Sequence, residues 1–180
     1  MGGPAHRTWR AFTVRARSEK RVADRLSAAG IETFLPLRRA LRQWSDRKKW
    51  VEVPLFSGYV FARVDERERL GVLETEAVGK TVSFGDTLAE VPEQEIEILR
   101  TLMSVPDRLE AVARDAFPVG AEVILTNGPL KGVRGHVTDH PRDAYLSVEV
   151  PSIRQSIRVQ VPTDWTMRPP GDTSPAASPS

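Results

Sequence analysis

Apolar residues in the first thirty positions recur first at every second residue and then at the spacing of an α-helix. Thr8–Arg15 carries bulky residues at alternate positions, which predicts a strand. The next segment predicts a helix that Ser18 caps and Gly30 ends, because its apolar residues recur at i, i+4 and i+7. That apolar face consists of Val22, Leu26 and Ala29. A strand followed by a helix indicates a mixed α/β domain.

Extended segments follow this helix and predict a hairpin. Residues 33–37 and 38–44 have extended patterns, and Trp50–Pro54 returns after a turn at Ser45-Asp46. The next strand is expected at Gly58–Val64 and is apolar on both faces. A strand of this kind needs cover on both sides, so we expect helices over one face and the domain core under the other.

Short helices and strands complete the first domain. A helix near Arg67–Glu74 and a strand near Thr81–Phe84 lead to a helix that starts at Pro92. The expected buried stripe of that last helix is Ile96, Leu99, Leu102 and Met103. We therefore predict an α+β protein whose first domain, residues 7–103, is a mixed α/β sandwich. Residues 104–116 are expected to be a linker that retains a partial helix.

The remaining residues predict a second, all-β domain at 117–167. Every second residue is apolar in Tyr145–Val150 and in Ser156–Val161. Asn127-Gly128 and further glycines mark turns, and four or five short strands can bury one common face by curling into a small barrel. The prolines and glycines of this segment disfavour helix, so we expect it to stay β. Residues 168–180 lack core-forming residues and predict a disordered tail.

Charge is distributed unevenly along the chain. The net charge is +2, but residues 1–60 carry 13 Lys and Arg against 5 Asp and Glu, whereas residues 61–110 carry 6 against 12. This concentration of cations favours a polyanionic partner over the alternative, a merely solvated basic surface. Arg17, Arg21 and Arg25 repeat every four residues and would form a basic ridge on the first helix.

Aromatic residues accompany the cations at the predicted hairpin. The candidate nucleic-acid-binding residues there are Arg42, Trp44, Arg47, Lys48 and Lys49. Lysine and arginine bind phosphates without sequence preference, and a tryptophan stacks on unpaired bases. For Trp44 and Trp50 the alternative, packing within the hairpin, stays open.

Leu55, Phe56 and Tyr59 form a candidate protein-binding site, which we call the aromatic patch. Helices and the sandwich interior account for most apolar residues of this strand. Phe56 lies just before the strand, next to Ser57-Gly58, where such cover is least certain. An exposed aromatic side chain at that position would mark a protein-binding surface.

Residue clusters typical of enzymes are missing. The chain has no cysteine, which excludes a disulfide framework, a thiol nucleophile and a thiolate zinc site. Its three histidines are scattered, and the acidic groups near Asp65 and Glu93 fit helix ends and solvated faces better than a metal-dependent nuclease, the alternative from the enzyme class. We therefore expect no catalytic residue, no metal site and no cofactor.

Apolar stretches stay well short of the ~18 residues of a membrane span. The N-terminal segment MGGPAHRTW also lacks the apolar stretch of a signal peptide. We expect a cytoplasmic protein with no membrane partner.

Two motifs in order resemble the NusG family of transcription elongation factors. TWRAFTVRARSEKRVADRL, residues 8–26, resembles the opening strand and first helix of the family, and PLFSGYVF, residues 54–61, its signature strand. VGAEVILTNGPLKGVRGHV, residues 119–137, is similar to the KOW motif of an SH3-like barrel. LRQWSDRKKWVEVPLF, residues 41–56, resembles the UpxY-type branch of operon-specific antiterminator paralogues.

This resemblance implies an NGN-like first domain, an SH3-like KOW barrel and a role in transcription. The first domain would bind the clamp helices of the largest RNA polymerase subunit through Phe56, Tyr59 and Leu55, bridge the clamp, and suppress pausing and termination. The basic ridge and the hairpin would face upstream or non-template DNA. The KOW domain would recruit a ribosomal small-subunit protein or the Rho terminator, with Ile153 where general members carry an aromatic residue.

The alternatives are a general NusG elongation factor and a ribosome-associated, RNA-binding KOW protein. Nothing in the sequence requires more than a monomer.

Overall fold

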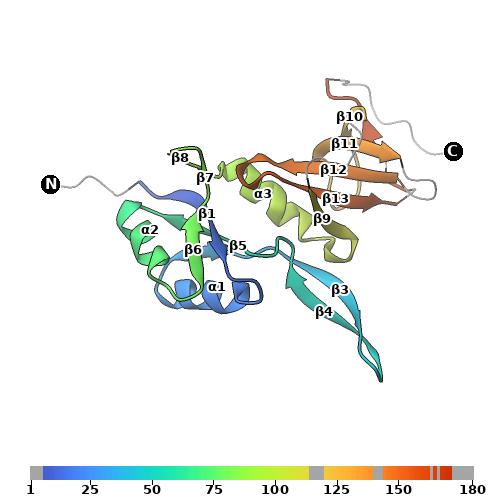
Figure 1. Cartoon of the computed structure of the whole chain (residues 1–180). Helices are drawn as coiled ribbons and strands as arrows, with labels where there is room; N and C mark the ends of the chain where they lie inside the picture. Colours follow the sequence, from blue (N-terminus) through green and yellow to red (C-terminus); the bar gives the residue numbers. More distant parts are fainter. Residues whose placement is uncertain (1–5, 114–119, 140–143, 163, 166, 172–180) are drawn as a thin grey trace.

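The N-terminal sheet has four antiparallel strands in the order β2-β5-β1-β6 (Figure 1). The computed structural model describes residues 6–113, 120–139, 144–162, 164–165 and 167–171. The strands of this sheet are β1 (Thr8–Val14), β2 (Glu32–Phe34), β5 (Tyr59–Val64) and β6 (Val78–Thr81). Together with its helices and two hairpins, this sheet is referred to below as the first domain.

Both faces of the central strand β5 are covered, as its apolar pattern predicts. The helices are α1 (Glu19–Ala28), α2 (Glu66–Leu73) and α3 (Glu93–Leu102). Val60 and Val64 pack in one cluster with residues of α1 and α2, while Phe61 packs in another with residues of α3. The stripe predicted for α3 is confirmed at Ile96, Leu99 and Leu102, which are fully buried, and Met103 is partly buried.

A side-chain capping signal sets the start of α2 but not that of α1. α2 begins with a capping box, because Asp65 Oδ1 accepts from Glu68 N at 2.8 Å and Glu68 Oε2 accepts from Asp65 N at 3.0 Å. Ser18 stands at the N-cap of α1, but its side chain makes no capping hydrogen bond. Ala23 is buried in place of the predicted Ala29.

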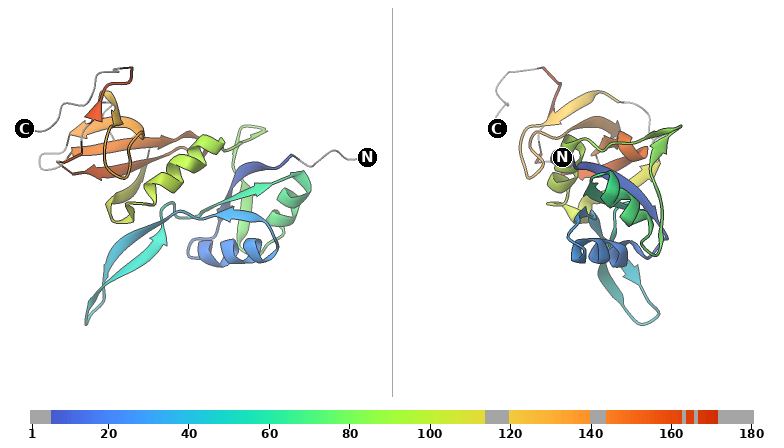
Figure 2. Two further views of the ribbon diagram at one scale, coloured as in Figure 1. Left: turned by 180° about the vertical axis from the view of Figure 1, so that it is seen from behind. Right: turned by 90° about the vertical axis from the view of Figure 1, so that its left-hand side faces the viewer.

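Two hairpins stand apart from the N-terminal sheet. The longer one pairs β3 (Leu37–Gln43) with β4 (Lys48–Pro54) and projects away from the rest of the chain (Figures 1 and 2). The shorter one pairs β7 (Ser83–Phe84) with β8 (Thr87–Leu88).

The second sheet, referred to below as the second domain, has six antiparallel strands in the order β14-β10-β11-β12-β13-β9. Its strands are β9 (Leu109–Ala113), β10 (Glu122–Leu125), β11 (Arg134–Asp139), β12 (Ala144–Val150), β13 (Gln155–Val161) and β14 (Met167–Arg168). The alternation predicted for β12 and β13 is confirmed in part. The predicted apolar residues are buried, namely Leu146, Val148, Val150, Ile157, Val159 and Val161, but Ser147 and Ser156 are buried as well. Among the described residues β14 and β9 are the sheet edges, and no pairing joins them into a closed barrel.

A close approach of strands explains one glycine of the 119–137 motif. A Cβ added at Gly135 would lie 2.4 Å from Ser147 O, well inside van der Waals contact. Only glycine therefore lets β11 lie this close to β12, where His136 pairs with Ser147.

Segments predicted as linker and tail contribute strands to the second sheet. Within the predicted linker, Pro106–Arg108 forms a short 3-10 helix (η1) and Leu109–Ala113 forms β9. β9 pairs with β13, with Ile157 opposite Ala111. Arg168, the first residue of the predicted tail, pairs with Ile124 of β10, while residues 172–180 lie outside the described residues.

One apolar cluster runs through both domains. It extends from Trp9 and Phe61 through Leu99 of α3 to Ile153 and Ile157 of the second domain. In Figures 1 and 2, α3 lies between the two sheets. The packing of α3 therefore joins the two halves into one core.

Candidate functional site

The aromatic patch is largely buried, so the structure does not show the exposed aromatic side chain at Phe56 that would mark a protein-binding surface. Leu55 is 2% exposed and Phe56 is 3% exposed, whereas Tyr59 is only partly buried. The Phe56 ring packs edge-on against Phe61, with 6.3 Å between ring centroids. Leu55 N donates to Pro36 O at 2.8 Å, so the backbone at the foot of the hairpin turns these two side chains inward.

A buried carboxylate fixes the loop after Phe56. Glu19, which is 3% exposed, accepts a hydrogen bond of 2.8 Å from Gly58 N. Gly58 has φ +81°, a left-handed conformation that costs glycine little. The sequence places Glu19 at the helix start but gives no sign that it reaches across to Gly58, so this positioning residue was not predicted.

The second domain lies against the aromatic patch. A cavity of about 310 Å³ is lined by Leu55, Phe56 and Tyr59 together with Gln155 of β13. Tyr59 also lines a second cavity of about 190 Å³ with Ile153 and Arg154. Ile153, the predicted partner-binding residue of the second domain, is itself only 4% exposed. The two predicted protein-binding sites thus face each other across one interface, which we call the domain interface.

Polar contacts also cross the domain interface. Ser152 donates to Glu95 Oε2 of α3 twice, from Oγ at 2.5 Å and from the backbone N at 3.4 Å. The Arg154 guanidinium stacks 4.6 Å above the Phe84 ring. Arg39 of the hairpin forms an ion pair with Asp107 of η1 at 3.5 Å. These contacts fix the 151–155 turn to the first domain and the foot of the hairpin to η1.

Burial raises the pKa of Glu95, although the two hydrogen bonds from Ser152 act in the opposite direction. Desolvation disfavours the charged form of a carboxyl group, and here it outweighs the donors. The domain interface is therefore more favourable when Glu95 carries a proton.

The predicted basic ridge is partly neutralised. Arg21 and Arg25 form ion pairs with Glu76 at 3.9 Å and 3.1 Å. The hydrogen bond from Arg25 is the main reason that the pKa of Glu76 is lowered. Arg17 precedes the helix and has φ +69°, so it belongs to the turn before α1 and not to the α1 surface itself.

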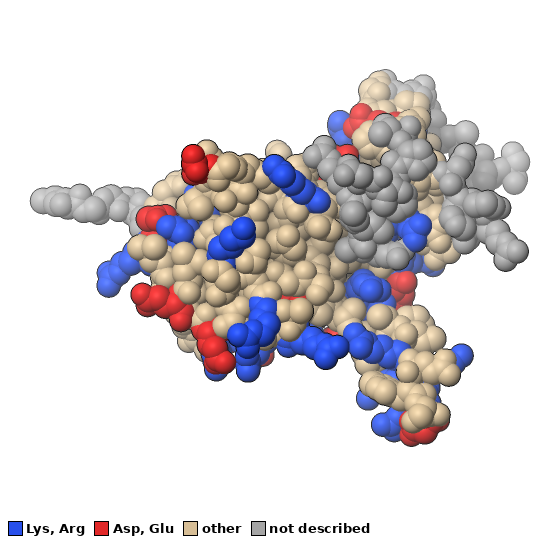
Figure 3. All heavy atoms as spheres, viewed as in Figure 1, with Lys and Arg blue, Asp and Glu red and all other residues tan. Residues whose placement is uncertain are grey.

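The hairpin carries the candidate nucleic-acid-binding residues at exposed positions. Residues 41–50 are all exposed, and Figure 3 shows blue cations along the projecting hairpin. Trp44 is 46% exposed and Trp50 is 49% exposed, so neither is packed away as the alternative required. Sequence reasoning missed Arg39, whose guanidinium lies 5.5 Å from the Trp50 ring centroid. The register pairs Arg39 with Glu52, which lies two residues from Trp50 and on the same face. That pairing could have suggested the contact between Arg39 and Trp50.

Comparison with known proteins gives the family. The family model described as "Transcription termination factor nusG" matches residues 7–100. The chain belongs to the NusG family. NusG family proteins are transcription factors, not enzymes.

A solved NusG structure shares the fold at low sequence identity. The structure described as "Domain interaction in Thermotoga maritima NusG" is 19% identical, covers 86% of this chain and 93% of that chain, and gives a TM-score of 0.54. Conformations A and B of the MjSpt4:Spt5 complex are each 16% identical, cover 90% and 88% of this chain and 99% and 95% of those chains, and give TM-scores of 0.32 and 0.30. No curated protein matches the chain in sequence.

The described parts of this NusG-family chain contain no candidate metal-binding cluster and no candidate membrane-spanning helix. Across those ranges, His, Asp and Glu nowhere form a group of three or more that could hold a metal ion. No helix within them is long and apolar enough to cross a membrane. His140 lies outside the described residues.

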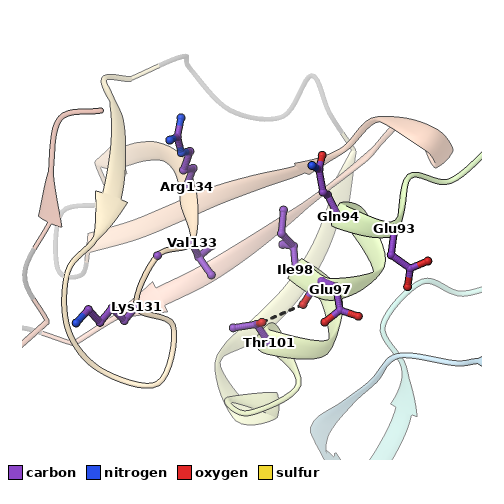
Figure 4. Close-up of a pocket in the computed structure, with 9 residues that line it drawn as sticks. Glu93, Gln94, Glu97, Ile98, Thr101, Lys131, Val133 and Arg134 are labelled. Atoms are coloured by element: carbon purple, nitrogen blue, oxygen red, sulfur yellow. Dashed lines mark hydrogen bonds between the residues drawn. The ribbon is translucent and has the colours of Figure 1, made fainter. Parts of the chain in front are cut away.

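A wide cleft of about 670 Å³ separates α3 from the loop before β11 (Figure 4). Glu93 and Glu97 lie on the helix side, and Lys131 and Arg134 lie on the loop side. The sequence did not predict this cleft, because its walls come from segments about thirty residues apart that meet only when the domains pack.

Proposed function

We propose that this NusG-family chain is a transcription elongation and antitermination factor that acts at selected operons in the cytoplasm. It binds RNA polymerase through its first domain, bridges the clamp, and suppresses pausing and termination. Membership of the family supports the polymerase partner. The resemblance of residues 41–56 to the UpxY-type branch supports action on selected operons.

Polymerase binding uses Leu55, Phe56 and Tyr59, which engage the clamp helices once the two domains separate. The supporting observation is that this apolar patch shares a buried cluster with Ile153 of the second domain. Separation exposes apolar side chains on both sides, and such surfaces bind other proteins. The form described here is then a closed one that has to open before it binds polymerase.

The second domain is proposed to be an SH3-like KOW domain that recruits its own partner through the surface around Ile153. Residues 119–137 and the antiparallel sheet support this assignment. The partner is a ribosomal small-subunit protein or the Rho terminator. Because Ile153 faces the first domain, opening would free both binding surfaces in one step.

Nucleic-acid contacts are proposed for the hairpin and the basic ridge, which face upstream or non-template DNA. The hairpin residues Arg42, Trp44, Arg47, Lys48 and Lys49 are exposed and combine phosphate-binding cations with a stacking aromatic. Arg21 and Arg25 add positive charge on α1, and Arg17 adds it in the turn before that helix. No cofactor is required, and the active form is a monomer.

A pull-down of core RNA polymerase tests the proposed patch. Three full-length proteins are compared, and all of them carry Ile153→Asp to open the interface. The first has no other change, the second adds Tyr59→Ala, and the third adds Leu70→Ala at an exposed apolar residue elsewhere as the control. We expect Tyr59→Ala to reduce retention at least tenfold and Leu70→Ala to leave it unchanged. Equal retention of all three proteins would remove the aromatic patch from the proposal.

Genome-wide occupancy distinguishes the proposed role from that of a general NusG factor. An operon-specific factor occupies polymerase on a small set of transcription units, whereas a general factor occupies it on nearly all genes. Co-sedimentation with ribosomes that is unaffected by Tyr59→Ala would instead favour the ribosome-associated KOW protein.

A further inference from the structure

The β3–β4 hairpin carries one exposed tryptophan on each of its two faces. Its register pairs Leu41 with Trp50 and Arg42 with Lys49. Side chains of paired residues share a face, and successive residues alternate between faces. Leu41 and Trp50 therefore lie on one face, and Arg42 and Lys49 on the other.

Trp44 continues the face of Arg42. It follows the last residue of β3, Gln43, and its N donates to Arg47 O at 2.8 Å, so the two chains stay paired up to the turn. Because Trp44 lies two residues after Arg42, their side chains share a face. Trp44 and Trp50 therefore lie on opposite faces of the hairpin.

Each face combines its tryptophan with cations. On the Trp50 face, Arg39 lies 5.5 Å from the ring centroid and Lys48 is exposed two residues along the strand. On the Trp44 face, Arg42 and Lys49 are exposed. Acidic residues between 37 and 54 are limited to Asp46 at the turn and Glu52 near the foot. Both faces therefore have the composition that suits phosphates and unpaired bases.

The hairpin is held at its foot and free at its outer half. Arg39 pairs with Asp107 at 3.5 Å, and Lys20 Nζ donates to Glu52 O at 2.9 Å. Beyond these contacts, every residue from 41 to 50 is exposed. Because β3 has 7 residues and a strand rises about 3.3 Å per residue, the hairpin extends roughly 20 Å from its foot. It projects clear of both sheets in Figures 1 and 2.

We propose that this hairpin is a two-faced wedge that binds the junction between duplex and single-stranded nucleic acid. Each tryptophan stacks on an unpaired base of a different strand, and the cations beside it bind the phosphates of that strand. A single strand engages one face only, and a blunt duplex offers no unpaired base. A fork with two diverging arms engages both faces at once. This inference rests on the proposed nucleic-acid role of the hairpin and adds the structure of its ligand.

Binding of the full-length chain to three labelled DNA probes, measured by fluorescence anisotropy, tests the wedge. The probes are a single strand, a blunt duplex and a fork whose two arms are unpaired. We expect the fork to bind about tenfold more tightly than either other probe, because one more base stacks on an aromatic ring. Trp44→Ala and Trp50→Ala should each lower fork affinity to that of the single strand. Leu70→Ala, at an exposed apolar residue of α2, should leave all three affinities unchanged.

Several outcomes overturn the wedge while leaving the nucleic-acid role intact. These are equal affinity for fork and single strand, loss of affinity in only one of the two tryptophan variants, and a fork preference that survives both substitutions. Absence of binding to all three probes, with the hairpin engaging a protein instead, overturns the proposed nucleic-acid role itself.

Discussion

Ser152 of the second domain donates a 2.5 Å hydrogen bond from Oγ to Glu95 Oε2 on helix α3. This bond lies beside the cluster that buries Leu55, Phe56 and Ile153, so a charged group borders the apolar contact between the domains. Any change that alters the cost of burying Glu95 therefore changes the balance between the closed and the open chain.

Closure is expected to depend on pH through Glu95. Its pKa in the closed form is raised, because burial disfavours the carboxylate. Glu95 therefore holds its proton more tightly in the closed form than in the open form. The stability that this proton gives the closed form is lost as pH rises through the raised pKa. We expect closure to strengthen as pH falls from neutral toward 4.5, the ordinary Glu value.

Glu95→Gln should remove this dependence and favour closure at neutral pH. The amide carries no charge to desolvate, and its oxygen still accepts from Ser152. Because the chain lacks cysteine, spin labels can be attached at Glu74→Cys and Asp164→Cys, one exposed site in each domain, to measure the interdomain distance. Glu97→Gln, an exposed change on the same helix, is the control. A distance distribution that ignores pH in the unmodified chain would contradict the expectation.

Ile153→Asp should open the chain. The side chain is 4% exposed, so the substitution places a carboxylate in the apolar cluster, where an unpaired charge is strongly unfavourable. The same spin labels should report a longer and broader interdomain distance, and polymerase retention should rise. Ala121→Asp adds the same charge at an exposed position of the second domain and should change neither measurement. Unchanged distances in Ile153→Asp would show that the interface tolerates charge.

Much of the fold follows from local pattern. The two apolar faces of Gly58–Val64 required cover on both sides, and the structure places α1 and α2 on one face and α3 on the other. The spacing of Ile96, Leu99 and Leu102 gave the buried stripe of α3 because a helix contacts its surroundings along one side. These patterns repeat within a few residues, so they can be recognised without tertiary structure.

The state of the candidate site depended on contacts that local pattern does not contain. Cover of Phe56 was the least certain because nothing near it in sequence covers it, and it is buried in a cluster that includes residues about one hundred positions away. Likewise Leu109–Ala113 looked like a linker until β13 gave it a pairing partner. The exposure of Trp44 and Trp50 could be judged only once the hairpin was seen to project.

Phe56→Ala should act first on stability. The ring is 3% exposed and packs on Phe61, and truncation of a buried phenylalanine costs about 3–5 kcal/mol through lost burial and the cavity left behind. Denaturant unfolding of the full chain measures this loss, and Ser57→Ala at the exposed neighbour should cost little. Loss of polymerase binding in Phe56→Ala alone is therefore ambiguous, which is why the pull-down uses the partly exposed Tyr59. An unfolding curve identical to that of the unmodified chain would contradict the burial.

Glu76→Gln should strengthen binding of non-specific duplex DNA at low salt. Glu76 lies 3.9 Å from Arg21 and 3.1 Å from Arg25, so it competes with phosphate for both guanidinium groups. Its removal frees two cations, and each additional phosphate contact steepens the slope of log affinity against log salt by about 0.9. Anisotropy titrations over a series of salt concentrations measure that slope. Arg21→Ala/Arg25→Ala should make it shallower than in the unmodified chain, and Glu74→Gln, an exposed neighbouring acid, is the matched control. If Glu76→Gln and Glu74→Gln give the same slope as the unmodified chain, α1 does not face DNA and the hairpin alone carries the contact.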